Sequence, residues 1–162
     1  MAELVVSRTE GDLLVGLGLG SCIGLVLAEP GLRVAALAHI VLPASSEGSS
    51  AATPAKFADS AVPAMLAELE RLGARRPRLF ATMVGGAQMF SMGASLDIGA
   101  RNDSAVRAAL AAARIPLRAA VTGGSTGRTI RAFVGSGSVT CKEAGGPEIE
   151  LLDGAPALRV AA

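Results

Sequence analysis

Aromatic side chains are nearly absent from this sequence, which has four phenylalanines and neither tryptophan nor tyrosine in 162 residues. Proteins that bind single-stranded nucleic acid or sugars commonly stack the ligand on such rings, so this shortage argues against both functions. An excess of one charge is also lacking, because 15 basic and 14 acidic side chains leave a formal net charge of +1. No global field then attracts nucleic acid or anionic lipid, and we expect no nucleic-acid partner.

Cysteine and histidine are scarce as well. The two cysteines, Cys22 and Cys141, and the single histidine, His39, cannot supply the four ligands of a usual zinc site. The cysteines lie far apart in the sequence and form no spacing pattern typical of a disulfide framework. We therefore expect two free thiols in a reducing compartment, with neither a metal nor a cofactor.

Segments typical of membrane insertion or export are missing too. The uncharged stretch at residues 13–28 contains four glycines and falls short of the roughly 20 residues that span a bilayer as a helix. The N-terminus lacks the basic segment followed by an apolar run that marks a signal peptide. These features predict a cytoplasmic protein with no direct membrane insertion.

The length fits a single domain over residues 1–162. The pattern predicts seven or eight strands, and the turn-rich segment from about residue 145 to 162 is expected to be a loosely held tail. Two main helices lie between blocks of strands rather than alternating with them. The predicted fold class is therefore α+β, a layered sandwich of helices on a mixed or antiparallel sheet.

The two predicted helices have recognisable ends. The first runs from residue 53 to 73, and Pro63 inside it is expected to kink or split the helix. The second is expected to be capped by Asn102 or Asp103. The small polar residues at 44–52 predict a loop, either a lid or a plain linker. Within 88–93, the apolar side chains of Met89, Phe90 and Met92 are expected to fill the core.

Residues 16–43 hold both Cys22 and His39 and are interpreted as a β-hairpin. If Pro30 and Gly31 are the central turn residues, Cys22 directly faces His39, with Cβ atoms about 4.5–5.5 Å apart. A four-residue loop would keep this register and a bulge would break it. The opposite face is apolar and is expected to seat the hairpin on a core: Ile23, Leu25, Leu27, Leu32, Val34 and Ala36.

A thiol beside an imidazole suits nucleophilic catalysis. A thiol attacks as the thiolate, and a neighbouring histidine raises the fraction of thiolate by taking the proton. The chemistry this favours is acyl transfer at an amide or ester, with the backbone N–H groups of Ser21 and Cys22 binding the oxyanion. One cysteine and one histidine are a weak signal by themselves, and a structural role in the core is the alternative.

Five motifs occur in a fixed order along the chain: Gly-Leu-Gly-Ser-Cys at 18–22, Ala-His-Ile-Val-Leu-Pro at 38–43, Gly-Gly-Ala-Gln-Met-Phe at 85–90, Ile-Gly-Ala-Arg-Asn at 98–102, and Thr-Gly-Gly with Gly-Arg-Thr-Ile at 122–130. Together they resemble the chemoreceptor glutamine deamidase family, CheD. The resemblance implies a hydrolase that converts glutamines in the cytoplasmic helices of chemotaxis receptors to glutamate. It further implies Cys22 as nucleophile through a thioester, His39 as general base, and a CheC-type phosphatase as a further partner.

One position departs from the family pattern. Members with a described triad carry a threonine six residues before the cysteine, where this chain has Gly16. Ser21, Thr82 or a backbone carbonyl are then the candidates to orient His39. Two other interpretations stay open, namely a weakly active or inactive binding module that docks receptors or the phosphatase, and a cysteine amidohydrolase or esterase with another protein substrate.

Overall fold

The computed structural model describes residues 2–45, 53–88 and 97–153. The described strands are β1 (Leu4–Ser7), β2 (Leu13–Leu19), β3 (Ile23–Glu29), β4 (Val34–Ile40), β5 (Phe80–Gly85), β6 (Leu117–Thr122), β7 (Arg128–Phe133), β8 (Val139–Glu143) and β9 (Glu148–Leu152). The helices are α1 (Ala58–Arg71) and α2 (Ile98–Ala112), with short 3-10 turns at Pro30–Leu32, Pro54–Lys56 and Arg76–Arg78.

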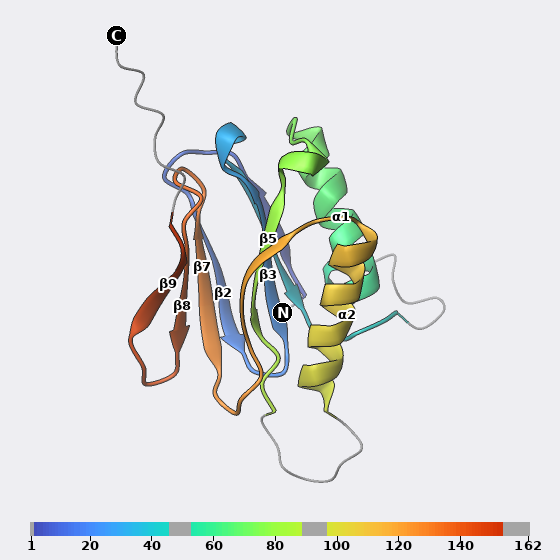
Figure 1. Cartoon of the computed structure of the whole chain (residues 1–162), viewed down its shortest axis with the longest axis vertical. Coiled ribbons are helices and arrows are strands. Elements are labelled where there is room, and N and C mark those ends of the chain that lie inside the picture. Colours follow the sequence, from blue (N-terminus) through green and yellow to red (C-terminus); the bar gives the residue numbers. More distant parts are fainter. Residues whose placement is uncertain (1, 46–52, 89–96, 154–162) are drawn as a thin grey trace.

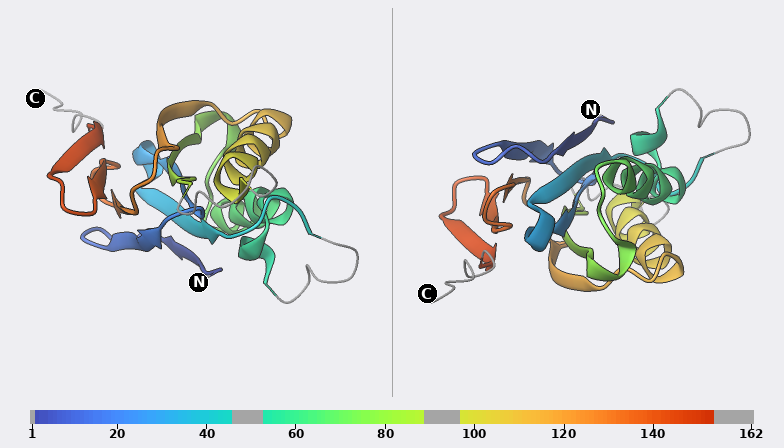
Figure 2. Two further views of the ribbon diagram at one scale, coloured as in Figure 1. Left: turned by 90° about the horizontal axis from the view of Figure 1, so that it is seen from below. Right: turned by 90° about the horizontal axis from the view of Figure 1, so that it is seen from above.

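These elements form three layers (Figures 1 and 2). A five-stranded sheet in the order β1-β4-β3-β5-β6 lies between the two helices and a four-stranded sheet in the order β2-β7-β8-β9. Only β5 and β6 pair in parallel, with α2 as their connection, and the other strand pairs are antiparallel. The predicted α+β layered sandwich with two main helices is confirmed.

Two hydrophobic cores lie on the two faces of the five-stranded sheet. One packs α1 and α2 against the sheet, and the other fills the space between the two sheets. Strands β3 and β4 are buried along their whole length because they take part in both cores. The predicted apolar face of the hairpin is confirmed, since it packs against the helices: Ile23, Leu25, Leu27, Leu32, Val34 and Ala36.

The turn between β3 and β4 has four residues, a length that the prediction allowed, but it is centred one residue later than Pro30 and Gly31. Glu29 pairs with Val34, so residues 30–33 form the loop. Pro30 has a fixed φ that suits the start of a 3-10 turn better than the primed turns of two-residue hairpins. Arg33 closes the turn in the left-handed region, with φ 55°, and its amide donates to Pro30 O at 3.0 Å.

This turn shifts the register by two residues and corrects the prediction that Cys22 directly faces His39. His39 pairs with Gly24, and Cys22, just before β3, is level with Val41. Side chains alternate with a period of two, so a shift of two leaves Cys22 and His39 on the same face. They are diagonal neighbours. In such pairs the residues are about 7–8 Å apart and their Cβ atoms somewhat closer, a separation that an aromatic side chain can still bridge.

The helix ends also differ from the prediction. Helix α1 begins at Ala58, and Pro63 does not split it, because this proline faces solvent and the carbonyl it leaves free can be hydrated. Helix α2 begins at Ile98 and is capped by Asp97, whose carboxylate accepts from the Ala100 amide at 2.9 Å. The predicted cap Asn102 instead lies buried within the helix.

The segment expected to be a loose tail contains a strand. Residues 148–152 form β9 and pair with β8, while residues 154–162 lie outside the described residues. The same holds for most of the expected loop at 44–52 and for the expected core residues from 89 to 93. Among the helices that the structure describes, none is long and apolar enough to cross a membrane.

Candidate active site

Cys22 lies in the bend between β2 and β3, where its side chain is half-buried. Neither it nor the buried Cys141 is in a disulfide, as predicted. Three successive carbonyl oxygens of the bend are held from inside the protein. Gly20 O accepts from the Ala87 amide at 2.8 Å, Ser21 O from Asn102 Nδ2 at 2.9 Å, and Cys22 O from the Gly86 amide at 2.9 Å.

The inward carbonyls fix where the amide hydrogens of the bend point. In a trans peptide the C=O and the following N–H lie on opposite sides of the chain, and the described residues contain no cis peptide. The N–H groups of Ser21 and Cys22 therefore face away from the residues that hold the carbonyls. Neither donates a hydrogen bond to another described residue. They are free to bind an oxyanion next to the thiol.

Glycines allow the backbone behind Cys22 to pack this closely. Gly85 has φ +120°, and a Cβ there would lie 2.1 Å from Cys22 O. A Cβ on Gly99, in the first turn of α2, would lie 2.5 Å from Gly86 O. The Gly-Gly-Ala and Ile-Gly-Ala-Arg-Asn motifs thus place the end of β5 and the start of α2 directly against the bend.

His39 lies near the end of β4, on the face that looks toward the four-stranded sheet. Its side chain is 9% exposed, and its Nε2 is buried without a hydrogen-bond partner among the described residues. Gly24 pairs with His39 across the ladder, and the space beside it is filled by Leu19 and Ile130. A Cβ on Gly24 would come within 2.7 Å of Leu19 Cδ1. The two residues lie diagonally across the end of the β3–β4 ladder, and no hydrogen bond joins the Cys22 sulfur to the imidazole.

Burial makes both groups neutral at rest. Desolvation raises the pKa of the Cys22 thiol and lowers the pKa of His39, while the carboxylate of Glu3 acts on His39 in the opposite direction. Desolvation favours the uncharged form of each group. The site therefore holds a neutral thiol beside a neutral imidazole, which can accept the thiol proton when a substrate is attacked.

We predict that alkylation of Cys22 by iodoacetamide is slow at pH 7 and rises with pH to a midpoint above that of a free thiol. The raised pKa means that less thiolate is present at neutral pH. The rate is measured by mass spectrometry in Cys141→Ala, which carries Cys22 as its single thiol. A midpoint below that of free cysteine would indicate a resting thiolate–imidazolium pair instead.

Neither Thr82 nor the Ser21 side chain, both proposed to orient His39 in place of the family threonine, forms a hydrogen bond with it in the described structure. Thr82 lies on β5, where it pairs with Val26 of β3. Strand β5 is two strands away from β4, a distance of about 10 Å at the usual strand spacing. The Ser21 hydroxyl makes no hydrogen bond with a described residue, and its carbonyl is held by Asn102. At Gly16, a Cβ would lie 2.9 Å from Ile130 Cγ2. Ile130 thus fills the space next to this position.

Three site features were missed from the sequence. Asn102 is buried against the bend, and Gly85 approaches Cys22. Glu3, directly before β1, lies beside His39, and its carbonyl accepts from the His39 amide at 3.0 Å. The first two lie in motifs that the sequence analysis quotes, and this is the signal that could have found them. Glu3 has no such signal, because only the strand pairing brings it beside His39.

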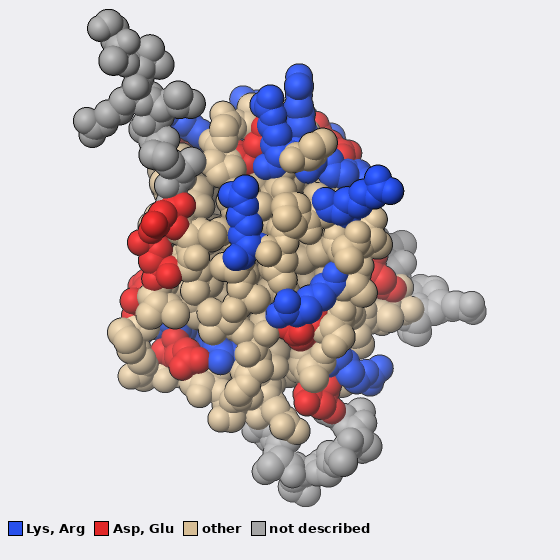
Figure 3. Space-filling view, in the orientation of Figure 1, with Lys and Arg blue, Asp and Glu red and all other residues tan. Residues whose placement is uncertain are grey.

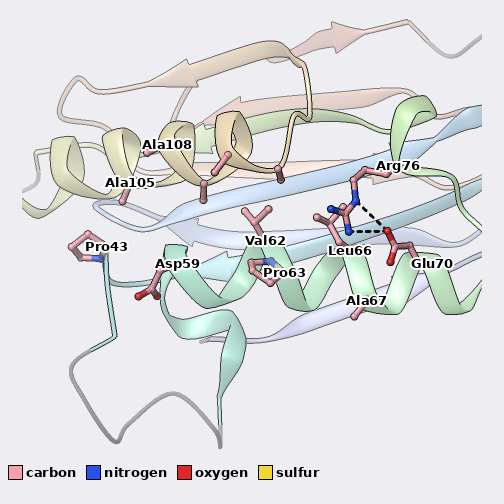
Figure 4. A pocket seen from close by; sticks show the side chains of 13 residues that line it. Pro43, Asp59, Val62, Pro63, Leu66, Ala67, Glu70, Arg76, Ala105 and Ala108 are labelled. Atoms are coloured by element: carbon pink, nitrogen blue, oxygen red, sulfur yellow. Dashed lines mark hydrogen bonds and ion pairs between the residues drawn. The ribbon is translucent and has the colours of Figure 1, made fainter.

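Other surfaces surround this site without joining it. A polar depression of about 500 Å³ lies beside the bend and is lined by Gly86, Asp103, Thr122 and neighbouring residues. An apolar groove of about 670 Å³ lies between α1 and α2 and contains neither Cys22 nor His39 (Figure 4). Within the described residues, no three His, Cys, Asp or Glu side chains converge to hold a metal ion.

Charged side chains on the surface are paired only in part. On the face seen in Figure 3, basic and acidic side chains lie among wide neutral areas. In the basic cluster at 75–78, Arg76 pairs with Glu70 at 2.9 Å and Arg78 lies 3.7 Å from Glu29. Exposed pairs of this kind contribute little to stability.

Comparison with known proteins gives consistent matches. The family model described as "CheD chemotactic sensory transduction" matches residues 41–143. A "Probable chemoreceptor glutamine deamidase CheD" of Symbiobacterium thermophilum is 46% identical over 155 residues, which are 93% of this chain and 94% of that protein. A protein of the same name from Moorella thermoacetica is 45% identical over 151 residues, 91% of this chain and 90% of its own. One from Desulforamulus reducens is 44% identical over 138 residues, 83% of this chain and 82% of its own.

Proposed function

The chain belongs to the CheD family, and on this premise we propose that it is a protein-glutamine deamidase acting on chemoreceptors. The substrate is a glutamine side chain presented on a receptor's cytoplasmic helix, and the product is glutamate. Its place of action is the cytoplasm, where those helices lie. A CheC-type phosphatase is a proposed second partner that competes with the receptor.

One observation carries this proposal above all others. The bend of Cys22 has its carbonyls held inward and its amide hydrogens free, and it lies diagonally opposite a buried, unpaired imidazole. A structural cysteine in a core needs none of these features. Together they supply a nucleophile, a base and an oxyanion site at one end of the central hairpin.

The reaction uses these groups in order. His39 takes the thiol proton while the Cys22 sulfur attacks the carboxamide carbon, and the amide hydrogens of Ser21 and Cys22 bind the oxyanion. The C–N bond then breaks, His39 returns the proton, and ammonia leaves a thioester on Cys22. Water, deprotonated by His39, attacks this thioester, the C–S bond breaks, and His39 returns the proton to the Cys22 sulfur. One glutamine and one water thus give one glutamate and one ammonia.

The polar depression beside the bend suits the flanking part of a helical substrate. Asp103 lines it and is ionised, because its hydrogen bonds with Arg107 and Thr122 lower the pKa of its carboxyl against the effect of burial. Arg107 Nε lies 2.8 Å from an Asp103 carboxylate oxygen. Hydroxyl and carboxylate groups there can accept hydrogen bonds from polar side chains next to the target glutamine.

A binding module that docks receptors without efficient turnover is the second candidate. The observation that favours it is Gly16, which has no side chain to orient the ring, and His39 Nε2 has no hydrogen-bond partner in the described part of the chain. In triads of this kind a third group orients the histidine, and its loss lowers the rate without removing the nucleophile. This candidate keeps the fold and the docking surface and loses most of the chemistry.

The role of the missing threonine can be tested at Gly16. Gly16→Thr alone should destabilise the protein by about 1–3 kcal/mol, because the new side chain collides with Ile130. Ile130→Ala removes the colliding methyl group, so Gly16→Thr is best compared in that background. If the third group limits turnover, the double variant deamidates faster than Ile130→Ala. An equal or lower rate contradicts that account.

The proposed function itself is tested by incubating the protein with soluble cytoplasmic fragments of chemoreceptors. Mass spectrometry then locates glutamines converted to glutamate, and we expect conversion at a few specific positions. Receptor binding without any conversion would overturn the enzyme and support the binding module. Hydrolysis of small esters or amides, with receptor glutamines untouched, would support a cysteine hydrolase with another substrate.

A further inference from the structure

Asn102 is a fully buried polar side chain to which the reaction above gives no role. It lies in α2 with no exposed surface, and its Nδ2 donates to Ser21 O and to Val41 O, both at 2.9 Å. Both partners are carbonyl oxygens, which only accept, so the side chain must present its NH₂ group to them. A single amide therefore joins the helix to the two strand ends beside the site.

The other end of the same amide is left without a partner. Asn102 Oδ1 is buried and receives no hydrogen bond within the described ranges. An unpaired buried acceptor costs about 1–3 kcal/mol of folding free energy. This cost arises at a position where the two protons of the Asn102 NH₂ group reach Ser21 O and Val41 O. Such an unsatisfied group calls for a reason other than stability.

We propose that Asn102 is a positioning residue that aims the Cys22 amide hydrogen at the oxyanion of the reaction. The Ser21 carbonyl and the Cys22 N–H belong to one peptide unit and point to opposite sides of it. Holding Ser21 O inward therefore holds the Cys22 N–H outward, beside the thiol. The hydrogen bond to Ser21 O also polarises the peptide, which makes its N–H a stronger donor.

The second hydrogen bond of Asn102 fixes the base relative to the nucleophile. The β3–β4 ladder ends at the pair Ile23 and Ile40, so Cys22 and Val41 lie one step beyond it. Asn102 bridges the two strand ends at this step, through Ser21 O and Val41 O. Val41 follows His39 by two residues on the same strand. The spacing between thiol and imidazole thus depends on this bridge.

This inference rests on the proposed function only for the nature of the substrate, so its test uses two small reagents. p-Nitrophenyl acetate acylates the thiolate through a tetrahedral oxyanion, forming a C–S bond and releasing p-nitrophenolate. Iodoacetamide alkylates the same thiolate by displacing iodide, and no oxyanion forms. The ratio of the two rates reports the oxyanion donors, because thiolate content and access affect both reactions. Cys141→Ala serves as the background.

Asn102→Leu should lower the ratio of acylation to alkylation about 10- to 100-fold, part of the 10²–10³-fold effect of losing an oxyanion donor. The matched control is Val106→Ala, one turn further along α2 and equally buried, which should leave the ratio within about twofold. If Asn102→Leu does not fold, Asn102→Ala replaces it, since the alanine side chain has no group to donate and needs less space than asparagine.

The outcomes separate this inference from the proposed function. A parallel fall of both rates, or an unchanged ratio in the Asn102 variants, overturns the positioning role whatever the substrate is. A wild-type protein that is alkylated but never acylated overturns it as well. If the ratio falls as expected but the wild type converts no receptor glutamine, the role of Asn102 stands and the proposed function does not.

Discussion

Cys22→Ala should lower the rate of receptor glutamine deamidation by at least about 10⁴-fold, because it removes the only atom that forms the thioester. His39→Ala should lower it about 10²–10⁴-fold, the usual effect of losing a general base. Time courses of amide-to-acid conversion, followed by mass spectrometry, measure both rates. Receptor binding should stay within a few-fold of the wild type in both variants.

The second cysteine provides the matched control for this result. Cys141 is fully buried in the core between the two sheets and pairs with Ile130 on β7. Cys141→Ala should therefore reduce stability while keeping the deamidation rate at temperatures where it is folded. Turnover that survives in Cys22→Ala, or that disappears in Cys141→Ala, would place the nucleophile elsewhere.

Gly85→Ala should disrupt the site nearly as strongly without touching a reacting atom. The new Cβ would lie 2.1 Å from Cys22 O, at a φ of +120° that alanine rarely adopts. The backbone strain alone costs about 1–3 kcal/mol, and the collision must be relieved by moving the bend. A displacement of about 1 Å in a reacting group can cost 10²-fold in rate, so we expect at least that loss.

A second glycine serves as a control that separates the effect of backbone strain from the effect of moving the bend of Cys22. Gly145, in the turn before β9, has φ +76° and no atom within 4 Å of the position a Cβ would take. Gly145→Ala should lose about 1 kcal/mol of stability and keep the deamidation rate. Thermal unfolding and turnover are measured for both variants. Equal rates in the two would mean that the contact between Gly85 and Cys22 has no part in catalysis.

Local sequence patterns predicted most of the fold because they depend on residues close together in the chain. Alternating and continuous apolar runs predicted seven or eight strands, close to the nine that the structure describes. Errors occurred where a turn or cap depended on more than local preference. Pro30 and Gly31 indicated a turn, but the turn is centred one residue later, because Arg33 closes it in a left-handed conformation that the sequence did not signal.

Helix α2 shows the same limit at its start. Asn102 and Asp103 are good capping residues, and their preference predicted that the helix begins there. The helix begins at Ile98 because Asp97 caps it, which frees Asn102 to turn inward toward Ser21 and Val41. A propensity for caps cannot distinguish these two uses of asparagine, since the partners of Asn102 lie 81 and 61 residues away.

The sequence alone predicted Cys22 and His39 as the catalytic pair, because their residue types and motifs indicate the chemistry regardless of the fold. The tertiary structure decided how they meet. It made them diagonal rather than direct neighbours, turned the amide hydrogens of the bend outward, and brought Gly85, Asn102 and Glu3 to the site. The physical reason is that these contacts join strands and a helix far apart in the chain, and only packing sets their register.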